Sequence, residues 1–323
     1  MADKVHIAVA ADHNYLHGLQ ATMASMILSA SDREALAFHV FADGLTEDDC
    51  VSVSALARRL GCARPIDFIR PDMSRIVSLF EPYKGSHAAF LRLFFGEFLN
   101  LDKVIYADVD TLWFRDVCRL WDEPSDGVSI LWCRDIPSIA DDVGLYAREW
   151  DPSFDPERYC CSGVMVMNLK RMRETKLIDR CVDFARRWGT PIFVDQDILN
   201  FVCRDDARIL PRHWDLMMPD PSAREGAVLH FNGVGSMFNG TFQGWRPLYE
   251  IWFRFYYDVV LQDRKRTTCG RFRRFVLAVI GLAYPIDRVL RIDRLFKPRM
   301  RDQLIRVSYF GWLRLRSKWY GRW

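Results

Sequence analysis

The chain has 323 residues, of which 50% are hydrophobic and 27% are charged, a composition that supplies a large buried core and excludes an intrinsically disordered protein. No stretch approaches eighteen consecutive apolar residues, so we expect no membrane-spanning helix. The net charge is only +3, but the two signs are distributed very unevenly along the chain.

Strand-like and helix-like segments alternate along the first two hundred residues. Short apolar runs predict buried strands, and apolar residues that recur every three or four positions predict helices. Thr46 is a predicted N-cap, with Asp49 three positions later. The alternation predicts an α/β fold with a largely parallel sheet covered by helices on both faces. The expected strands are Val5–Ala11, Ala37–Ala42, Pro65–Ile69, Lys103–Ala107, Val128–Trp132, Val164–Met167 and Ala227–Phe231, and the expected helices are Tyr15–Ser31, Thr46–Leu60, Ser86–Leu99, Lys170–Trp188 and Gln196–Cys203.

Two carboxylates follow the predicted strand Lys103–Ala107, in the sequence Asp108-Val109-Asp110. Alternate residues of an extended segment point to the same side, so both carboxylates can face one ion. Carboxylate oxygens suit hard cations such as Mg²⁺ or Mn²⁺. Ligands of open α/β sheets bind beyond the carboxyl ends of strands, which supports a metal site here. A solvated acidic turn remains the alternative, because the same Asp-x-Asp pattern recurs at residues 195–197.

The first and last predicted strands end in two further polar groups. Residues 10–15 (AADHNY) combine small residues that admit a ligand to the backbone with side chains that can bond a base edge or stack on a ring. A strand-to-helix turn with an N-cap is the alternative for this segment. Residues 230–233 (HFNG) begin with a histidine whose neutral imidazole could complete an ion's coordination shell, although a structural role is the alternative.

Six sequence blocks carry a resemblance to a known family. The chain resembles glycosyltransferase family eight, the retaining bacterial lipopolysaccharide and lipooligosaccharide galactosyl- and glucosyltransferases. The blocks occur in the family's order over residues 5–233, so the match is specific. They read IAVAADHNY, FLRLFFGEF, KVIYADVDTLW, SGVMVMNLKRMR, VDQDILN and VLHFNG.

This resemblance implies a GT-A fold over residues 1–262, in which a Rossmann-like nucleotide-binding half with a mixed sheet adjoins an acceptor-binding half. It implies that Asp108, Asp110 and His230 bind Mn²⁺ or Mg²⁺, and that the donor is UDP-galactose or UDP-glucose. The acceptor would be a lipopolysaccharide-type or other glycan or glycolipid. The implied catalytic residues are Gln196 and Asp195, and the implied nucleotide-sugar contacts are Ala10, Ala11, Asp12, Asn14, Tyr15, Arg92, Asp108, Val109, Asp135, Gly163 and Gly233.

Two positions depart from the family pattern. Cys161 stands where the family usually has an Asn that meets the transferred sugar. Ser236 stands in the frame of a Lys that holds the diphosphate. These departures leave the identity of the sugar open, and they motivate the alternative of a catalytically weak nucleotide-sugar-binding or scaffold protein.

The expected reaction breaks the bond between the anomeric carbon and a phosphate oxygen, through a ring that becomes oxocarbenium-like. Gln196 is a poor nucleophile because a neutral amide oxygen is weakly basic, which favours attack by the acceptor on the face that the phosphate leaves. If a covalent intermediate forms instead, Asp195 is the better carboxylate candidate.

The last sixty residues differ from the rest of the chain. Residues 264–323 hold 17 Lys/Arg and 3 Asp/Glu, a balance of +14, whereas the other 263 residues hold 28 and 39, a balance of −11. Helical spacing would put Trp312, Leu315, Trp319 and Trp323 on one stripe, a pattern typical of an interfacial membrane helix. We therefore predict a basic, aromatic C-terminal tail of helical character (263–323) that binds an anionic membrane surface, although packing against the catalytic domain is the alternative.

The setting and the partners follow from the same observations. The N-terminus lacks the features of a signal peptide, and the nine cysteines show no disulfide or zinc-ribbon spacing, which favours a cytoplasmic protein on the inner face of the cytoplasmic membrane. A nucleic-acid-binding tail is the third hypothesis. It lacks any groove-reading or RNA-binding motif, so we expect no nucleic-acid partner.

Overall fold

The computed structural model describes residues 4–83, 86–217, 226–231, 252 and 255–262. Contacts within the chain define two compact units, Met1–Asp215 with Gly226–Asn232, and Leu216–Glu225 with Gly233–Trp323. In the second unit, the described residues include a π-helix at Tyr256–Val260, and Trp252 stacks on Tyr256 with ring centroids 5.1 Å apart. The boundary predicted at residue 262 lies at the edge of the described residues, so it stays a prediction together with the C-terminal tail.

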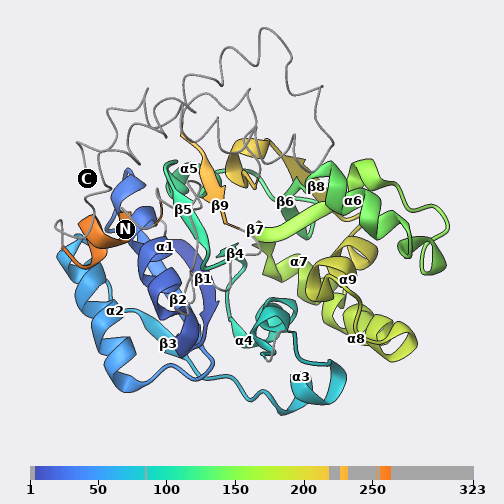
Figure 1. Ribbon diagram of the computed structural model, residues 1–323, viewed down its shortest axis with the longest axis horizontal. Helices are drawn as coiled ribbons and strands as arrows, with labels where there is room; N and C mark the ends of the chain where they lie inside the picture. Colours follow the sequence, from blue (N-terminus) through green and yellow to red (C-terminus); the bar gives the residue numbers. More distant parts are fainter. Residues whose placement is uncertain (1–3, 84–85, 218–225, 232–251, 253–254, 263–323) are drawn as a thin grey trace, which may run out of the picture. The chain divides into compact units, whose positions relative to one another are not determined.

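The first unit contains a seven-stranded mixed sheet in the order β3-β2-β1-β4-β7-β6-β8 (Figure 1). The neighbours β3–β2, β2–β1, β1–β4 and β6–β8 are parallel, whereas β7 runs antiparallel to both β4 and β6. The strands are β1 (Val5–Ala11), β2 (Leu36–Ala42), β3 (Asp67–Ile69), β4 (Lys103–Ala107), β6 (Ile130–Arg134), β7 (Cys160–Asn168) and β8 (Ala207–Leu210).

The antiparallel strand β7 corrects the expectation of a largely parallel sheet that the alternating pattern had suggested. The segment between β6 and β7 contains α6 (Pro137–Gly144) and two short 3₁₀ turns. Because β6 and β7 are antiparallel neighbours, this segment connects the end of β6 to the start of β7 on the same side of the sheet's strand ends, and it does not cross a face of the sheet. The α/β class is confirmed, and the sheet is mixed, as the family resemblance implies.

Two hydrophobic layers cover the two faces of the sheet. Alternate residues of β1 divide between them, with Ile7 and Val9 in the first layer and Ala8 in the second. The first layer contains buried side chains of α1 (Leu16–Ser29) and α2 (Glu47–Arg59). The remaining helices of the first unit are α3 (Ser74–Leu79), α4 (Phe95–Phe98), α5 (Val117–Trp121), α7 (Leu169–Glu174), α8 (Leu177–Trp188) and α9 (Val194–Val202), and of these α3, α4, α7, α8 and α9 contribute to the second layer.

Three predicted elements differ from the structure in more than the position of their ends. The expected helix Ser86–Leu99 is a 3₁₀ segment, Ala88–Phe94, followed by the single turn α4. Residues 90–95 are all buried, so the segment has no solvent-facing side from which a 3.6-residue period could be read. The expected helix Lys170–Trp188 is divided into α7 and α8, because Lys176 adopts the left-handed conformation with φ of 50°.

The third difference concerns the strand predicted at Ala227–Phe231. It is the short strand β9 (Val228–His230), which pairs antiparallel with β5 (Thr111–Trp113) in a separate two-stranded sheet (Figure 1). Its partner β5 was not predicted, and neither were β8, α3, α5 and α6.

Two absences apply to the described part of the chain. No helix there is long and apolar enough to cross a membrane. The eight cysteines there form no disulfide.

The predicted N-cap at Thr46 is confirmed. The Thr46 hydroxyl accepts a hydrogen bond from the Asp49 amide (3.2 Å), and the Asp49 carboxylate accepts one from the Thr46 amide (2.9 Å). This reciprocal pair is a capping box at the start of α2.

We predict that Thr46→Ala lowers the free energy of unfolding by about 1 kcal/mol, because it leaves the amide at the helix N-terminus without its hydroxyl partner. Ala55→Ser, at an exposed interior position of α2, is the control and should cost less. Urea unfolding followed by circular dichroism measures both, and equal losses in the two variants would contradict the role of the cap.

Candidate functional site

The short sheet of β5 and β9 places a histidine beside the two carboxylates that follow β4. Thr111 pairs with His230, and the Phe231 amide donates a hydrogen bond to the Asp110 carbonyl (2.9 Å). The His230 Nε2 atom lies 3.2 Å from Asp110 Oδ1 and 3.7 Å from Asp108 Oδ2. One ligand atom from each of the three residues therefore falls within 4.8 Å of the others.

Gly163 in β7 makes room for this arrangement. Its carbonyl accepts a hydrogen bond from the Asp108 amide (2.7 Å), which holds β7 against the end of β4. A Cβ atom at Gly163 would lie 2.2 Å from His230 Cε1 and 3.1 Å from Asp108 Oδ2. No side chain fits there, so the close approach of β7, the imidazole and the carboxylate requires glycine.

The charges of this group perturb one another. Burial lowers the pKa of His230, but the carboxylates of Asp215 and Asp110 raise it more, so it lies well above its usual value. Burial raises the pKa of Asp110, but the His230 imidazolium outweighs burial and holds it below its usual range. The pKa of Asp108 is raised, because burial and the charge of Asp110 outweigh the Arg92 guanidinium. In its protonated form His230 is therefore the positive partner of Asp110, and binding of a cation at Nε2 would require the loss of that proton.

Arg92 joins the carboxylate Asp108 to the second half of the site. Its side chain is 7% exposed, and it lies 2.8 Å from Asp108 Oδ1 and 3.2 Å from Asp195 Oδ2. The guanidinium also donates to the Ser162 carbonyl (2.8 Å) and packs 4.2 Å from the centre of the Tyr106 ring. Burial lowers the pKa of Arg92, but the two carboxylates raise it by more than burial lowers it. The guanidinium is therefore permanently charged between them.

Asp195 and Gln196 lie in the first turn of α9, and both contact β7 through Ser162. The Ser162 hydroxyl donates to Asp195 Oδ2 (3.0 Å), and the Ser162 amide donates to Gln196 Oε1 (3.0 Å). The Gln196 amide group donates to Asp135 Oδ2 (2.7 Å) and to the Tyr159 hydroxyl (3.0 Å). Both ends of the Gln196 side chain are thus held, and its oxygen faces β7.

The two buried carboxyl groups on either side of Gln196 titrate near neutrality. Burial raises the pKa of Asp195 to about 6, even though Arg92 opposes the shift. Burial also raises the pKa of Asp135 to about 6, against hydrogen bonds from the Ile136 amide and Gln196. Desolvation therefore makes both groups weaker acids than an exposed aspartic acid.

Three of the predicted nucleotide-sugar contacts, Asp12, Asn14 and Tyr15, follow the end of β1. The carboxylate of Asp12 accepts a hydrogen bond from the Tyr15 amide (3.0 Å) and caps the short 3₁₀ helix His13–Tyr15, so the N-cap alternative describes its contact in this structure. Asn14 is exposed and Tyr15 is half-buried. Burial raises the pKa of Tyr15, and the nearby charges of Asp110 and Asp12 raise it further. The Tyr15 ring is therefore close enough to the Asp110 carboxylate after β4 to feel its charge.

The remaining predicted nucleotide-sugar contacts differ in how far their side chains are buried. Ala10 and Ala11 pair with β2, where Ala11 is buried and Ala10 is half-buried. The Val109 side chain packs in the core, so any ligand contact from it would involve its main chain. Gly233, along with Ser236, lies outside the described residues.

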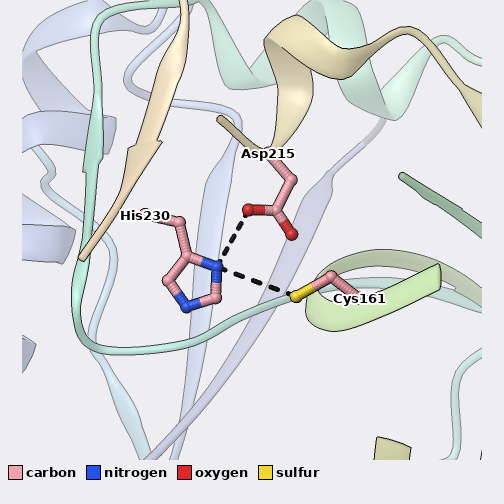
Figure 2. Close-up of side chains that lie close together, drawn as sticks. All are labelled: Cys161, Asp215 and His230. Atoms are coloured by element: carbon pink, nitrogen blue, oxygen red, sulfur yellow. Dashed lines mark hydrogen bonds and ion pairs between the residues drawn. The ribbon is translucent and has the colours of Figure 1, made fainter. Parts of the chain in front are cut away.

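Four residues of the site were not predicted from the sequence, and one of them is Ser162, which contacts Arg92, Asp195 and Gln196. Tyr106 donates a short hydrogen bond to Asp108 Oδ1, and strand alternation could have indicated this, since the two are separated by one residue. Asp215 Oδ1 lies 2.9 Å from His230 Nδ1, and Tyr159 contacts Gln196. Figure 2 shows Asp215 and Cys161 facing the same ring nitrogen of His230. No local pattern marks Asp215, because its partner is fifteen residues away in another element.

The donor set fits a divalent cation. Carboxylate oxygens and an imidazole nitrogen are ligands of Mn²⁺ and Mg²⁺ sites, with imidazole favouring the transition metal. Within the described residues, four carboxylates are in ion-pair contact with Arg92 and His230, those of Asp108, Asp110, Asp195 and Asp215. Carboxylates therefore outnumber the positive side chains, and a divalent ion would reduce this excess of negative charge.

Comparisons with known proteins identify the family. Residues 6–235 match the model of glycosyl transferase family 8, so the chain belongs to this family. It is 25% identical over 323 aligned residues to glucoside xylosyltransferase 1 of Danio rerio, with 85% of this chain and 76% of that protein covered. It is 33% identical over 111 residues to lipopolysaccharide 1,3-galactosyltransferase of Salmonella typhimurium, a match that covers 34% of this chain and 32% of that protein.

A solved structure supports the fold. The galactosyltransferase LgtC, in complex with donor and acceptor sugar analogues, superposes with a TM-score of 0.61 at 22% identity, covering 76% of this chain and 99% of that chain. This likeness confirms the predicted GT-A fold. Together with the family model, it places the chain among the glycosyltransferases.

We predict that Gly163→Ala disables the site without unfolding the protein, because the added methyl group would lie 2.2 Å from His230 Cε1 and force the ring to move. Gly96→Ala is the matched control, since a Cβ there would find its nearest neighbour at an ordinary 3.7 Å. The Gly163 variant should lose at least tenfold in Mn²⁺ affinity, measured by calorimetry with UDP present, while the Gly96 variant keeps it. Unchanged Mn²⁺ binding by the Gly163 variant would show that His230 is not held as described.

Proposed function

We propose that the protein is a retaining, Mn²⁺-dependent glycosyltransferase that transfers a hexose from a UDP-sugar to a lipopolysaccharide-type or other glycan acceptor. The observation that carries the proposal is the convergence of Asp108, Asp110 and His230 within 4.8 Å at the end of β4. When bound there, a divalent cation supplies positive charge against the diphosphate leaving group. Family membership supports the class of reaction.

The chain's own residues would divide the remaining work. Asp12, Asn14 and Tyr15 lie at the carboxyl end of β1, the edge at which nucleotides bind in such sheets. Arg92, with its charge already shared between Asp108 and Asp195, would orient these carboxylates next to the transferred sugar. Buried placement of these groups strengthens their electrostatic effect because water is excluded.

The hydrogen bonds around Gln196 support attack on the face that the leaving group departs from. Its amide nitrogen donates to Asp135 and Tyr159, so the side chain is fixed with its oxygen toward β7, suited to orient a group or stabilise positive charge on the ring. Asp195 Oδ2 is bonded to Ser162 and paired with Arg92, which makes this carboxylate a weaker nucleophile than a free one. An oxygen of the departing diphosphate would then accept the proton of the acceptor hydroxyl.

We predict that Asp110→Asn abolishes metal-dependent turnover while the protein stays folded, because the neutral amide removes a charged ligand and the partner of His230. Asp126→Asn, on an exposed turn, is the control. UDP release from UDP-galactose, UDP-glucose and UDP-xylose, with and without Mn²⁺, measures activity and identifies the donor. UDP-xylose is included because one relative is a xylosyltransferase. Undiminished turnover by the Asp110 variant would contradict the assignment of Asp110 as a metal ligand. If the unmodified chain shows no turnover with any of the three donors, the alternative of a nucleotide-sugar-binding or scaffold protein is favoured.

We also propose that the tail holds the protein on the inner face of the cytoplasmic membrane. Residues 264–323 have a balance of +14 and the rest of the chain −11, so the body by itself should be repelled by an anionic leaflet. Each Lys or Arg near such a leaflet contributes about 1 kcal/mol of attraction. The tryptophans at 312, 319 and 323 would add a contribution that does not depend on salt.

We predict that the full chain sediments with anionic liposomes and that raising the salt concentration weakens this binding, because exposed charges are screened over roughly 8 Å at physiological ionic strength. Arg314→Gln, Lys318→Gln and Arg322→Gln together should weaken it further. A matched triple variant of the body, Arg58→Gln, Lys170→Gln and Arg186→Gln, changes the net charge equally at exposed positions and should not. Equal loss in both triple variants would contradict a membrane role specific to the tail.

A further inference from the structure

Asp215 is a buried carboxylate that the proposed reaction does not yet use. Its side chain is 0% exposed, and it follows the 3₁₀ turn Arg212–Trp214. Its Oδ1 atom lies 2.9 Å from His230 Nδ1, and within the described residues its Oδ2 atom has no hydrogen-bond partner. A buried carboxylate with one unpaired oxygen is costly to the fold, so its presence beside the imidazole calls for a reason other than stability.

The geometry decides between two roles for this carboxylate. Cys161 Sγ also faces Nδ1, at 3.8 Å, and a thiolate, an imidazole and a carboxylate could in principle share a zinc ion (Figure 2). Nitrogen and oxygen ligands of a tetrahedral zinc ion lie about 3.3 Å apart. The observed 2.9 Å between Nδ1 and Oδ1 is instead the distance of a direct hydrogen bond. The shorter contact assigns the Nδ1 proton to Asp215 and not to the thiol.

We propose that Asp215 is a positioning residue for the metal ligand His230, an inference that rests on the proposed metal site. By accepting the Nδ1–H bond, Asp215 leaves the Nε2 lone pair for an ion at Asp108 and Asp110, and its negative charge makes that nitrogen a stronger ligand.

The surroundings of the ring support this role. The His230 side chain is 3% exposed and is confined by Gly163, which leaves no room for a Cβ on that side. Asp215 and Asp110 lie at opposite nitrogens, so the hydrogen bond at Nδ1 fixes the direction in which Nε2 points. Rotation of the ring about its attachment would break the contact with Asp215. The carboxylate therefore sets both the tautomer and the orientation of the imidazole.

Substitution of Asp215 in the full chain tests the proposal through Mn²⁺ affinity. Asp215→Ala removes the acceptor and its charge and should weaken Mn²⁺ binding about tenfold to a hundredfold. Asp215→Asn keeps the shape and an oxygen acceptor but loses the charge, so its loss should be smaller. The control is Asp206→Asn, which removes a largely buried carboxylate that is paired with Arg171 away from the site.

The measurement is the free Mn²⁺ signal in electron paramagnetic resonance, titrated with UDP present, and thermal unfolding checks that each variant is folded. A positioning role also predicts that the Mn²⁺ concentration for half-maximal turnover rises while kcat at saturating Mn²⁺ changes less. Should Asp215→Asn and Asp215→Ala both bind Mn²⁺ as tightly as the unmodified chain, the proposal is overturned. It is equally overturned if the purified protein holds one zinc ion that Cys161→Ser removes, because Asp215 would then be a ligand itself. Failure of the unmodified chain to bind Mn²⁺ at all would instead remove the proposed metal site on which this inference rests.

Discussion

The compensation of buried charge at the edge of the sheet is the constraint on which the site depends. Arg92 is paired with Asp108 and Asp195, and His230 is paired with Asp110 and Asp215. The contact between His230 and Asp108 joins these ion pairs into one group. Arg92 and His230 are both almost fully buried, so removal of either cation would leave its carboxylates without their positive partner in a medium where that is costly. The excess of negative charge supports the proposed cation at this site.

Close packing of the backbone makes this arrangement possible. Strand β7 is antiparallel to β4, and the Asp108 amide bonds the Gly163 carbonyl, so the ends of the two strands lie against each other. The pairing of β5 with β9 then carries His230 back toward Asp110. A glycine is required where the three segments meet, because an added methyl group would lie only 2.2 Å from His230 Cε1. The chemistry of the site therefore rests on main-chain contacts as much as on its side chains.

Hydrogen bonds connect the two halves of the site through one residue. Ser162 accepts from Arg92, donates its hydroxyl to Asp195 and donates its amide to Gln196. Ser162 lies in β7, directly before Gly163, so a shift of this strand would move the guanidinium, the carboxylate and the amide together. This coupling is consistent with the proposed attack on the face of the sugar that the leaving group departs from.

Much of the fold and part of the site could be read from the sequence. Short apolar runs determined β1, β2 and β4, since burial requires apolar side chains on both faces, and Thr46 with Asp49 determined the start of α2, since capping acts over three residues. Asp108 and Asp110 converge as predicted, but by a different route, because Val109 and Asp110 form a turn between β4 and β5 and do not continue an extended segment. The tertiary structure alone decided that β7 is antiparallel, that β9 leaves the main sheet, and that Asp215 meets His230. These features depend on pairing between segments far apart in the chain, and hydrophobic periodicity, which reports only whether a residue is buried, does not specify its partner.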